Sequence, residues 1–213
     1  FILDVLIMQL KYTHEDITNI LASMPDSVTH TPSFTYLNQT YATNDNIVLN
    51  LPDPKGKPTT YFAKLLNAHL IAEPTNQSKV PILQVQFYFN REHLDHRYKG
   101  VLKHLSVNEL FASNLTQYVP LNALIGKFKL CNLDEYVNSV EDHELKYSQS
   151  SIDIHNGNIE PSLDSRKKVC SCRKIENPDY NYIFCESCEQ WFHYFCVGIL
   201  DATNVSNFHF KCK

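Results

Sequence analysis

The feature that most constrains this chain is a run of cysteine and histidine residues near its C-terminal end. The spaced pairs read Cys170-x-Cys172, twelve residues, Cys185-x2-Cys188, four residues, His193-x2-Cys196, fifteen residues and Cys212. Structural zinc takes four tetrahedral Cys or His ligands, and a tight turn presents two closely spaced ligands to one ion. Metal-spaced cysteines in a chain without a recognisable secretory signal indicate zinc thiolates rather than disulfide bonds. The spacing therefore predicts bound zinc.

The series stops one ligand short of two complete zinc sites. A cysteine at position 215 would complete a final Cys-x2-Cys pair, but the sequence ends at Lys213. It also begins with Phe1 rather than methionine. We therefore expect a segment of a larger protein, in which the last ligand follows the end of this sequence.

Length, composition and charge narrow the remaining possibilities. The chain has 213 residues, of which 43% are hydrophobic and 20% charged, which fits one large or two smaller globular domains. The net charge of −4 gives no electrostatic reason to expect direct DNA binding. No apolar run approaches the roughly 20 residues of a membrane-spanning helix, so no membrane association is expected.

The patterning before the cysteine-rich part predicts mostly strands. The clearest strand signal is Ile82–Phe89, where apolar and aromatic residues alternate with glutamine. Further short strands are expected at 47–51, 108–114, 119–121 and 125–133. The turn residues between Pro52 and Pro58 separate two of the strand segments.

These patterns divide the chain into four parts. An N-terminal extension (1–40) holds an apolar run and a short helix expected near 16–24. A strand-rich domain (41–147) follows, then a polar linker (148–168), then the cysteine module (169–213). The predicted fold class is mainly β, with a small zinc-binding module at the end.

The cysteine module resembles the PHD finger family in its Cys/His order and in Trp191-Phe192-His193. The order differs from that of RING fingers, which place the histidine earlier, so ubiquitin ligation is not expected. The resemblance implies two interleaved, chemically inert zinc ions. One ion would be held by Cys170, Cys172, His193 and Cys196. The other would be held by Cys185, Cys188, Cys212 and the missing ligand.

Many PHD fingers bind the tail of histone H3, often with a methylated lysine held by aromatic side chains. The resemblance places Trp191 and Tyr182 where two walls of such an aromatic cage stand, and Tyr180 could supply another wall. Val169 and Glu176 occupy the remaining wall positions. The alternative is that Trp191 and Tyr182 only support the finger. Two acidic residues, Glu186 and Glu189, could face an arginine of a basic tail or simply be solvated.

The strand-rich domain resembles the BAH (bromo-adjacent homology) domain. The matching motifs, in order, are Pro54–Pro58 with Tyr61–Lys64, Val85–Phe89, Asn108–Asn114 and Val119–Phe128. Some BAH domains hold a methylated lysine between aromatic residues, and the resemblance places Tyr61, Phe87 and Phe89 there. Because Phe87 and Phe89 are two residues apart, they share one face of a strand. That geometry describes a cage or a hydrophobic core equally well.

A BAH domain followed by a PHD finger is an arrangement found in plant and fungal histone readers. The resemblance implies a nuclear, non-enzymatic chromatin reader that binds the H3 tail within a larger regulatory protein or complex. The alternative from a different class is a protein–protein scaffold that docks other subunits of a chromatin complex without reading methyl-lysine. No nucleophile elbow, phosphate-binding glycine loop or catalytic metal motif is present to indicate catalysis.

Overall fold

The computed structural model describes residue 15, residues 18–19, residue 22 and the ranges 28–53, 55–72, 79–94, 98–139, 145–200 and 209–212. The apolar run of the N-terminal extension, at 1–10, lies outside these residues, as does most of the predicted helix at 16–24. Within the described part of the chain, strands predominate, and no helix has both the length and the apolar character needed to cross a membrane. The mainly β fold class is confirmed.

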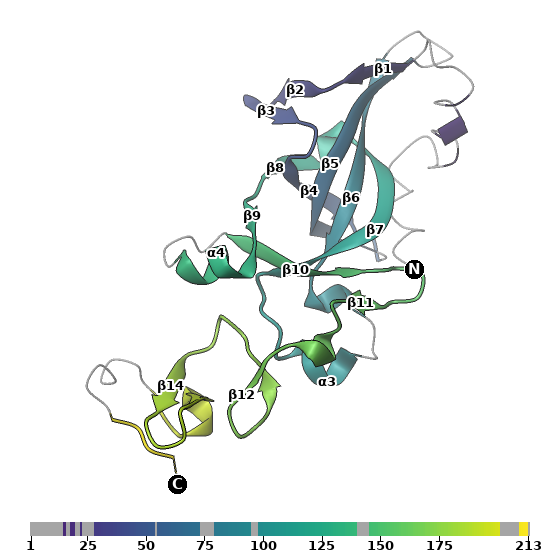
Figure 1. Cartoon of the computed structure of the whole chain (residues 1–213). Helices are drawn as coiled ribbons and strands as arrows, with labels where there is room; N and C mark the ends of the chain where they lie inside the picture. The colour runs from purple at the N-terminus through teal and green to yellow at the C-terminus, as the bar shows by residue number, and fades with distance from the viewer. Residues whose placement is uncertain are drawn as a thin grey trace.

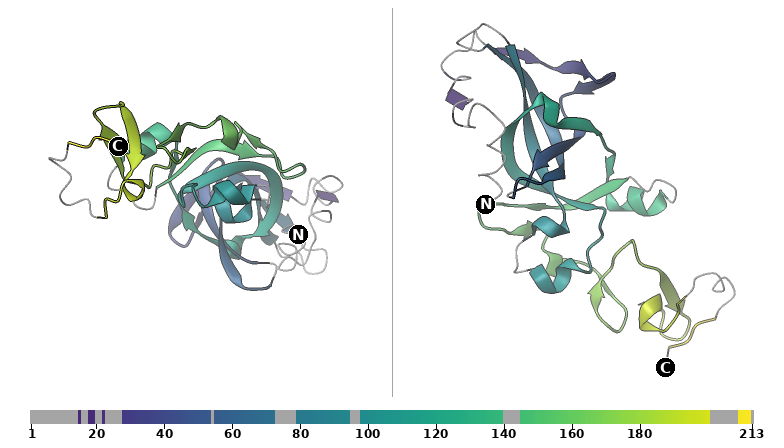
Figure 2. Two further views of the ribbon diagram at one scale, coloured as in Figure 1. Left: turned by 90° about the horizontal axis from the view of Figure 1, so that it is seen from below. Right: turned by 180° about the vertical axis from the view of Figure 1, so that it is seen from behind.

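The larger domain is one 9-stranded sheet with the central order β11-β10-β7-β6-β5-β4-β8. Its strands are β1 (Val28–Thr31), β4 (Asn46–Pro52), β5 (Pro58–Ala72), β6 (Lys79–Phe89), β7 (Glu109–Pro120), β8 (Leu124–Lys127), β9 (Leu130–Cys131), β10 (Lys146–Ile152) and β11 (Ile159–Glu160). Seen end-on, the long central strands curl around the interior (Figure 2). A separate hairpin joins β2 (Ser33–Tyr36) to β3 (Gln39–Ala42).

Short helices connect the strands. They are η3 (Arg91–His93), α3 (Lys99–Leu102), η5 (Leu121–Ala123), α4 (Leu133–Asn138), η6 (Leu163–Ser165) and η7 (Tyr194–Cys196). In α4 the Asn132 side chain accepts from the Glu135 backbone N–H at 2.8 Å, and the Glu135 carboxylate accepts from the Asn132 N–H at 3.3 Å. This reciprocal capping explains why a helix of six residues begins there.

The core of the larger domain comes from alternating residues of the long strands. In β7 the alternation buries Phe111 and Val119 completely, while Asn114 points outward. β5 and β6 pair antiparallel over most of their length and carry further buried residues such as Leu65 and Val85. The strands predicted separately at 108–114 and 119–121 are both part of β7.

Two parts of the chain differ from the expected boundaries. Part of the N-terminal extension belongs to the sheet, because β1 pairs antiparallel with β5 from Val28 to Thr31. Residues 148–168 are not an exposed linker, since β10 lies parallel to β7 and Ile152, Ile159 and Leu163 are buried in the core. Their polar composition is misleading because a few buried residues are enough to attach this segment to the core.

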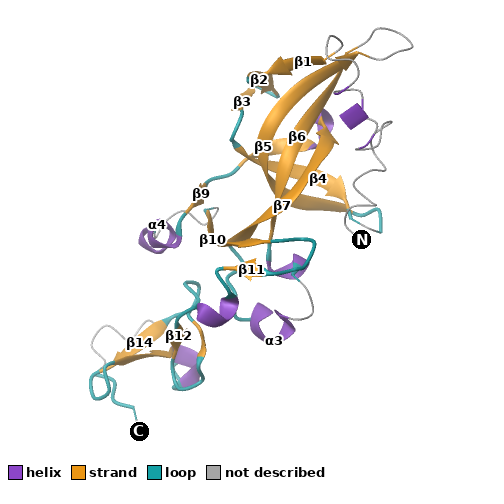
Figure 3. Cartoon of the chain, turned by 45° about the vertical axis from the view of Figure 1, so that its right-hand side comes forward, coloured by secondary structure: helices purple, strands orange, loops and turns teal. Residues whose placement is uncertain are grey.

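The cysteine module follows at the lower end of the larger domain (Figures 1 and 3). It contains two hairpins, formed by β12 (Lys168–Val169) with β13 (Lys174–Ile175), and by β14 (Tyr182–Cys185) with β15 (Gln190–His193). The Arg166 guanidinium enters the junction and donates two hydrogen bonds to the Glu109 carboxylate, at 2.9 and 2.6 Å. Both side chains are nearly buried, at 9% and 1% exposure. This ion pair ties the start of the module to the sheet.

Candidate metal centres and peptide-binding surface

The first turn of the module brings two thiols to one side. Cys170 and Arg173 have positive φ angles of 68° and 52°, which is uncommon for residues other than glycine. The Arg173 N–H closes this turn by donating to the Cys170 carbonyl at 3.1 Å. The tight backbone therefore points Cys170 and Cys172 at a common centre.

That centre also receives two ligands from β15 and η7. The ligand atoms of Cys170, Cys172, His193 and Cys196 all lie within 4.8 Å of one another. The His193 ring is fully buried, and its Nδ1 atom is 3.4 Å from the Cys172 Sγ and 3.8 Å from the Cys196 Sγ. Three thiols and one imidazole nitrogen around one point make up a ligand set typical of structural zinc.

A second cluster forms where the last strand pair meets the C-terminal segment. The sulfur atoms of Cys185, Cys188 and Cys212 lie within 4.8 Å of one another, so three ligands converge among the described residues. The Cys212 backbone N–H donates to the Cys185 sulfur at 3.2 Å, and the Cys212 and Cys188 sulfurs are 3.5 Å apart. The ligands of the two clusters alternate along the chain, as the interleaved arrangement predicted.

The electrostatics of the thiols favour a bound cation. Against the effect of burial, backbone N–H groups of Cys172 and His193 lower the pKa of the Cys170 thiol to about 6. A hydrogen bond from the Cys212 backbone lowers the pKa of Cys185 to about 6. Burial and the neighbouring thiols raise the pKa of Cys196 to about 12. Crowded thiols oppose ionisation of all of them together, and a divalent ion at the centre reverses that preference. The donor sets fit zinc.

Aromatic rings enclose the buried His193 ligand. Phe195 stacks on it with ring centroids 4.7 Å apart, and Tyr182 and Tyr180 lie at 4.9 and 5.6 Å. The Tyr182 hydroxyl accepts from the Asn177 N–H at 2.8 Å and donates to the Asn177 carbonyl at 2.9 Å. Burial raises the pKa of Tyr182 to about 12. Tyr182 thus packs against the metal site as well as bordering the surface.

Trp191 has a different environment, because it stands on the surface of the finger. It is 47% exposed and lies against Phe184, 40% exposed, with ring centroids 5.3 Å apart. The two residues face each other across the β14–β15 hairpin. The sequence reasoning did not select Phe184, although its spacing of two from Tyr182 places both on one strand face.

A groove of about 560 Å³ runs beside Trp191. Val169, Glu189 and Gln190 contribute to its walls, together with the basic side chains Lys167, Lys168 and Arg173. The predicted acidic residue Glu189 therefore borders the groove. Glu186 lies elsewhere, since its carboxylate pairs with the His209 Nδ1 at 2.6 Å and raises the pKa of that histidine.

The three aromatic residues proposed for a cage in the larger domain are core residues. Tyr61, Phe87 and Phe89 are 4%, 1% and 6% exposed and belong to the main hydrophobic cluster. The His93 ring stacks on Tyr61 at 5.8 Å and approaches Phe89 at 5.6 Å. Of the two alternatives, the burial of these side chains matches the hydrophobic core, and they offer very little accessible surface to a peptide.

Comparisons with known proteins agree with the geometry of the finger. The PHD-finger family model matches residues 170–213. Over 178 residues the chain is 24% identical to the chromatin remodeling protein SHL of Arabidopsis thaliana. This alignment covers 82% of this chain and 73% of SHL. Over 44 residues it is 39% identical to the nucleosome-remodeling factor subunit NURF301-like of Caenorhabditis elegans, covering 21% of this chain and 2% of that protein.

A solved structure of the yeast Rsc2 BAH domain aligns with a TM-score of 0.44 and 17% identity, over 62% of this chain and 54% of that one. The match to the family model and the two ligand clusters identify a PHD finger that could hold two zinc ions. The finger match and the similarity to SHL along most of the chain support the resemblance to BAH–PHD proteins.

Proposed function

We propose that this chain, a PHD finger carried by a mainly β domain of BAH type, is a nuclear chromatin reader that binds the methyl-lysine-bearing tail of histone H3. We place it within a larger regulatory protein or complex whose other parts carry any catalysis. The similarity to chromatin-remodeling proteins supports a role in chromatin. As part of the same proposal, the BAH-type part runs from β1 to η6, residues 28–165, rather than over 41–147, and the finger covers 169–213.

The observation that carries the proposal is the exposed pair Trp191–Phe184 on a two-stranded sheet. Large aromatic residues left half-exposed side by side usually mark a contact surface. Within the described part of the chain, their sheet contains β14 and β15 alone, so an extended peptide can add a third strand at an open edge and gain backbone hydrogen bonds. The indole face of Trp191 can then attract a methylated ammonium group by cation–π contact.

Peptide titration tests this function directly. Trp191 is the single tryptophan of the chain, so its fluorescence reports events at the finger surface. We expect saturable changes with an H3 tail peptide, and tighter binding when the lysine is trimethylated. Calorimetry on a Trp191→Ala variant should show lost binding, whereas Ile125→Ala, a change at a 54% exposed apolar residue of the larger domain, should bind normally. No response to any H3 peptide would refute the reader function.

A second candidate function, a scaffold without methyl-lysine readout, is favoured by the groove beside Trp191. Lys168 and Arg173 place positive charge where a methylated lysine would approach, and Val169 supplies an aliphatic wall rather than an aromatic one. Equal affinity for methylated and unmodified tails, or binding only to other subunits of a complex, would select this function over the first.

A further inference from the structure

The two hairpins of the PHD finger contribute opposite charges to the groove beside Trp191. Lys168 and Arg173 come from the β12–β13 hairpin, whereas Glu189 and Trp191 come from the β14–β15 hairpin. A methylated ammonium group suits the second pair, because the indole face and the carboxylate both attract a cation. The two cations of the first pair have no counterpart in such a ligand.

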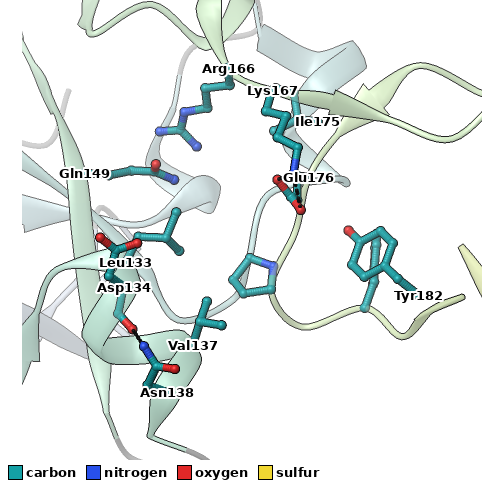
Figure 4. Close-up of a pocket in the computed structure, with 12 residues that line it drawn as sticks. Leu133, Asp134, Val137, Asn138, Gln149, Arg166, Lys167, Ile175, Glu176 and Tyr182 are labelled. Carbon is teal, nitrogen blue, oxygen red and sulfur yellow. Dashed lines mark hydrogen bonds and ion pairs between the residues drawn. The ribbon is translucent and has the colours of Figure 1, made fainter. Parts of the chain in front are cut away.

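Ion pairs within the chain do not neutralise these two cations. The neighbouring Lys167 is neutralised by the Glu176 carboxylate at 2.9 Å, and Figure 4 shows this pair. In the part of the chain that the structure describes, no carboxylate forms an ion pair with Lys168 or Arg173, and both residues are exposed. Glu189 lines the same groove, but its carboxylate is paired with neither of them. The β12–β13 side of the groove therefore offers two positive charges to a ligand.

The backbone beneath both cations is held in place. Lys168 lies opposite Ile175 in the β12–β13 ladder, and Ile175 is buried in the core of the larger domain. Arg173 ends the turn that its own N–H closes on the Cys170 carbonyl at 3.1 Å, next to the metal ligand Cys172. Cations on an ordered backbone bind an anion with a smaller loss of conformational entropy than cations on a flexible loop. This side of the groove is therefore preorganised for an anionic group.

An arginine and a lysine in one groove favour phosphate among anionic groups. A guanidinium donates two parallel hydrogen bonds to phosphate oxygens, and an ammonium adds a compact positive charge. A phosphorylated serine or threonine carries a charge of about −1.5 to −2 and three acceptor oxygens, which is more than a single carboxylate offers. A ligand that satisfies both hairpins therefore carries a methylated ammonium group and a phosphate on the same chain.

We propose that the groove beside Trp191 binds a phosphorylated serine or threonine two residues away from the bound methyl-lysine, with Lys168 and Arg173 holding the phosphate. The inference rests on the proposed function, because it names a second modification of the same tail. In an extended peptide, alternate side chains point to the same side, and residues two apart are separated by about 7 Å. A lysine at Trp191 thus brings the residue two positions away into the same groove. Phosphorylation strengthens binding, because it supplies the charge that the two cations lack.

Two H3 tail peptides test the inference on the full chain loaded with zinc. Both carry trimethyl-lysine and a threonine placed two residues after it, and they differ only in a phosphate on that threonine. Calorimetry at low salt should show about three- to ten-fold tighter binding of the phosphorylated peptide, the size of two partly exposed charge interactions. A higher salt concentration should reduce this gain, because salt screens exposed charges.

Substitutions in the groove identify the groups that hold the phosphate. Lys168→Gln and Arg173→Gln should each reduce the gain from phosphorylation by about two- to three-fold, without weakening the binding of the unphosphorylated peptide. Both side chains are exposed, so the substitutions leave the folded core untouched. Lys55→Gln is the matched control, because it removes the same charge at an exposed position of the larger domain and should keep the full gain.

The outcomes separate this inference from the reader function. Equal affinities for the two peptides, weaker binding of the phosphorylated one, or a gain that survives both groove substitutions would refute the phosphate site and leave the reader function intact. Absence of binding by either peptide would refute both. A DNA duplex is the remaining probe, because its phosphates could also meet the two cations. Duplex binding that is tighter than phosphopeptide binding and is lost in the same variants would assign the groove to nucleic acid instead.

Discussion

The larger domain and the PHD finger reach a fixed structure by different means. The larger domain buries aromatic and aliphatic residues from seven neighbouring strands, with Phe87, Phe111 and Val119 at 0–1% exposure. Among the described residues, the buried members of the finger's own cluster are Ile183, Cys185 and Phe192. A segment with so small a core needs another source of stability, and the two Cys/His clusters provide it.

The two regions use their aromatic residues in different ways. The larger domain uses its aromatic residues for packing, so Tyr61, Phe87 and Phe89 are hidden. In the finger, metal ligation can replace packing, and Trp191 and Phe184 remain available on the surface. The proposed ligand binding by exposed aromatic residues therefore falls on the finger.

Zinc removal is expected to have the largest effect on stability, and to unfold the finger while the larger domain stays folded. Structural zinc in small fingers contributes an apparent free energy of about 10–16 kcal/mol. A chelator, or Cys172→Ser, should unfold the finger and change the fluorescence of Trp191, while the far-ultraviolet dichroism of the larger domain persists. Cys131→Ser, at a cysteine outside both clusters, is the control. A finger that stays folded in chelator would contradict the claim that the finger, unlike the larger domain, depends on metal for its stability.

Breaking the buried ion pair at the junction is expected to have the second-largest effect on stability. Arg166→Met leaves the Glu109 carboxylate buried without a partner and should lower the free energy of unfolding by about 3–5 kcal/mol. Chemical denaturation followed by circular dichroism measures this change. Arg173→Met, at an exposed residue, serves as the control and should change the free energy of unfolding little. If both variants unfold alike, the junction does not depend on Arg166.

Trimming a core aromatic residue should have a smaller effect, confined to the larger domain. Phe87→Leu is expected to lower its free energy of unfolding by about 1–3 kcal/mol, because the shorter side chain fills the site poorly. Peptide affinity, measured by calorimetry at a temperature where the variant is folded, should not change. A specific loss of methyl-lysine binding without loss of stability would instead restore the cage hypothesis for this residue.

Acidification should produce the smallest effect, again in the larger domain. Burial, together with the nearby His30, lowers the pKa of His69 below its ordinary value of 6.5. The folded state therefore holds a neutral imidazole that the unfolded chain would protonate. Stability is retained above about pH 6.5 and is lost as the pH falls below it, by at most about 1.4 kcal/mol per pH unit for one group.

Denaturation at pH 7.5 and 5.5 with a His69→Leu variant isolates this contribution. The variant should lose less stability on acidification than the wild-type chain. The exposed His155→Leu should behave like wild type. An unchanged acid response in His69→Leu would show that other groups, His93 among them, dominate the pH dependence.

The sequence by itself determined the finger and the class of the larger domain. The spacing from Cys170 to Cys212 predicted bound zinc, because close ligand pairs suit tetrahedral coordination, and the resemblance to PHD fingers implied the interleaved ligand sets. The alternation at Ile82–Phe89 predicted a strand, and these residues form the C-terminal part of β6. Both signals are local, so each can be recognised without knowing which segments meet in space.

Only the tertiary structure decided which aromatic residues are exposed and where the two domains meet. An alternation of two assigns Phe87 and Phe89 to one face, but the burial of that face depends on strands far away in sequence. The segment 148–168 is polar in composition, which predicted a linker. Its parallel pairing with β7 is a feature of the assembled sheet and leaves no local pattern in the sequence. The groove beside Trp191 likewise exists because two separate hairpins meet, and no local pattern encodes such a meeting.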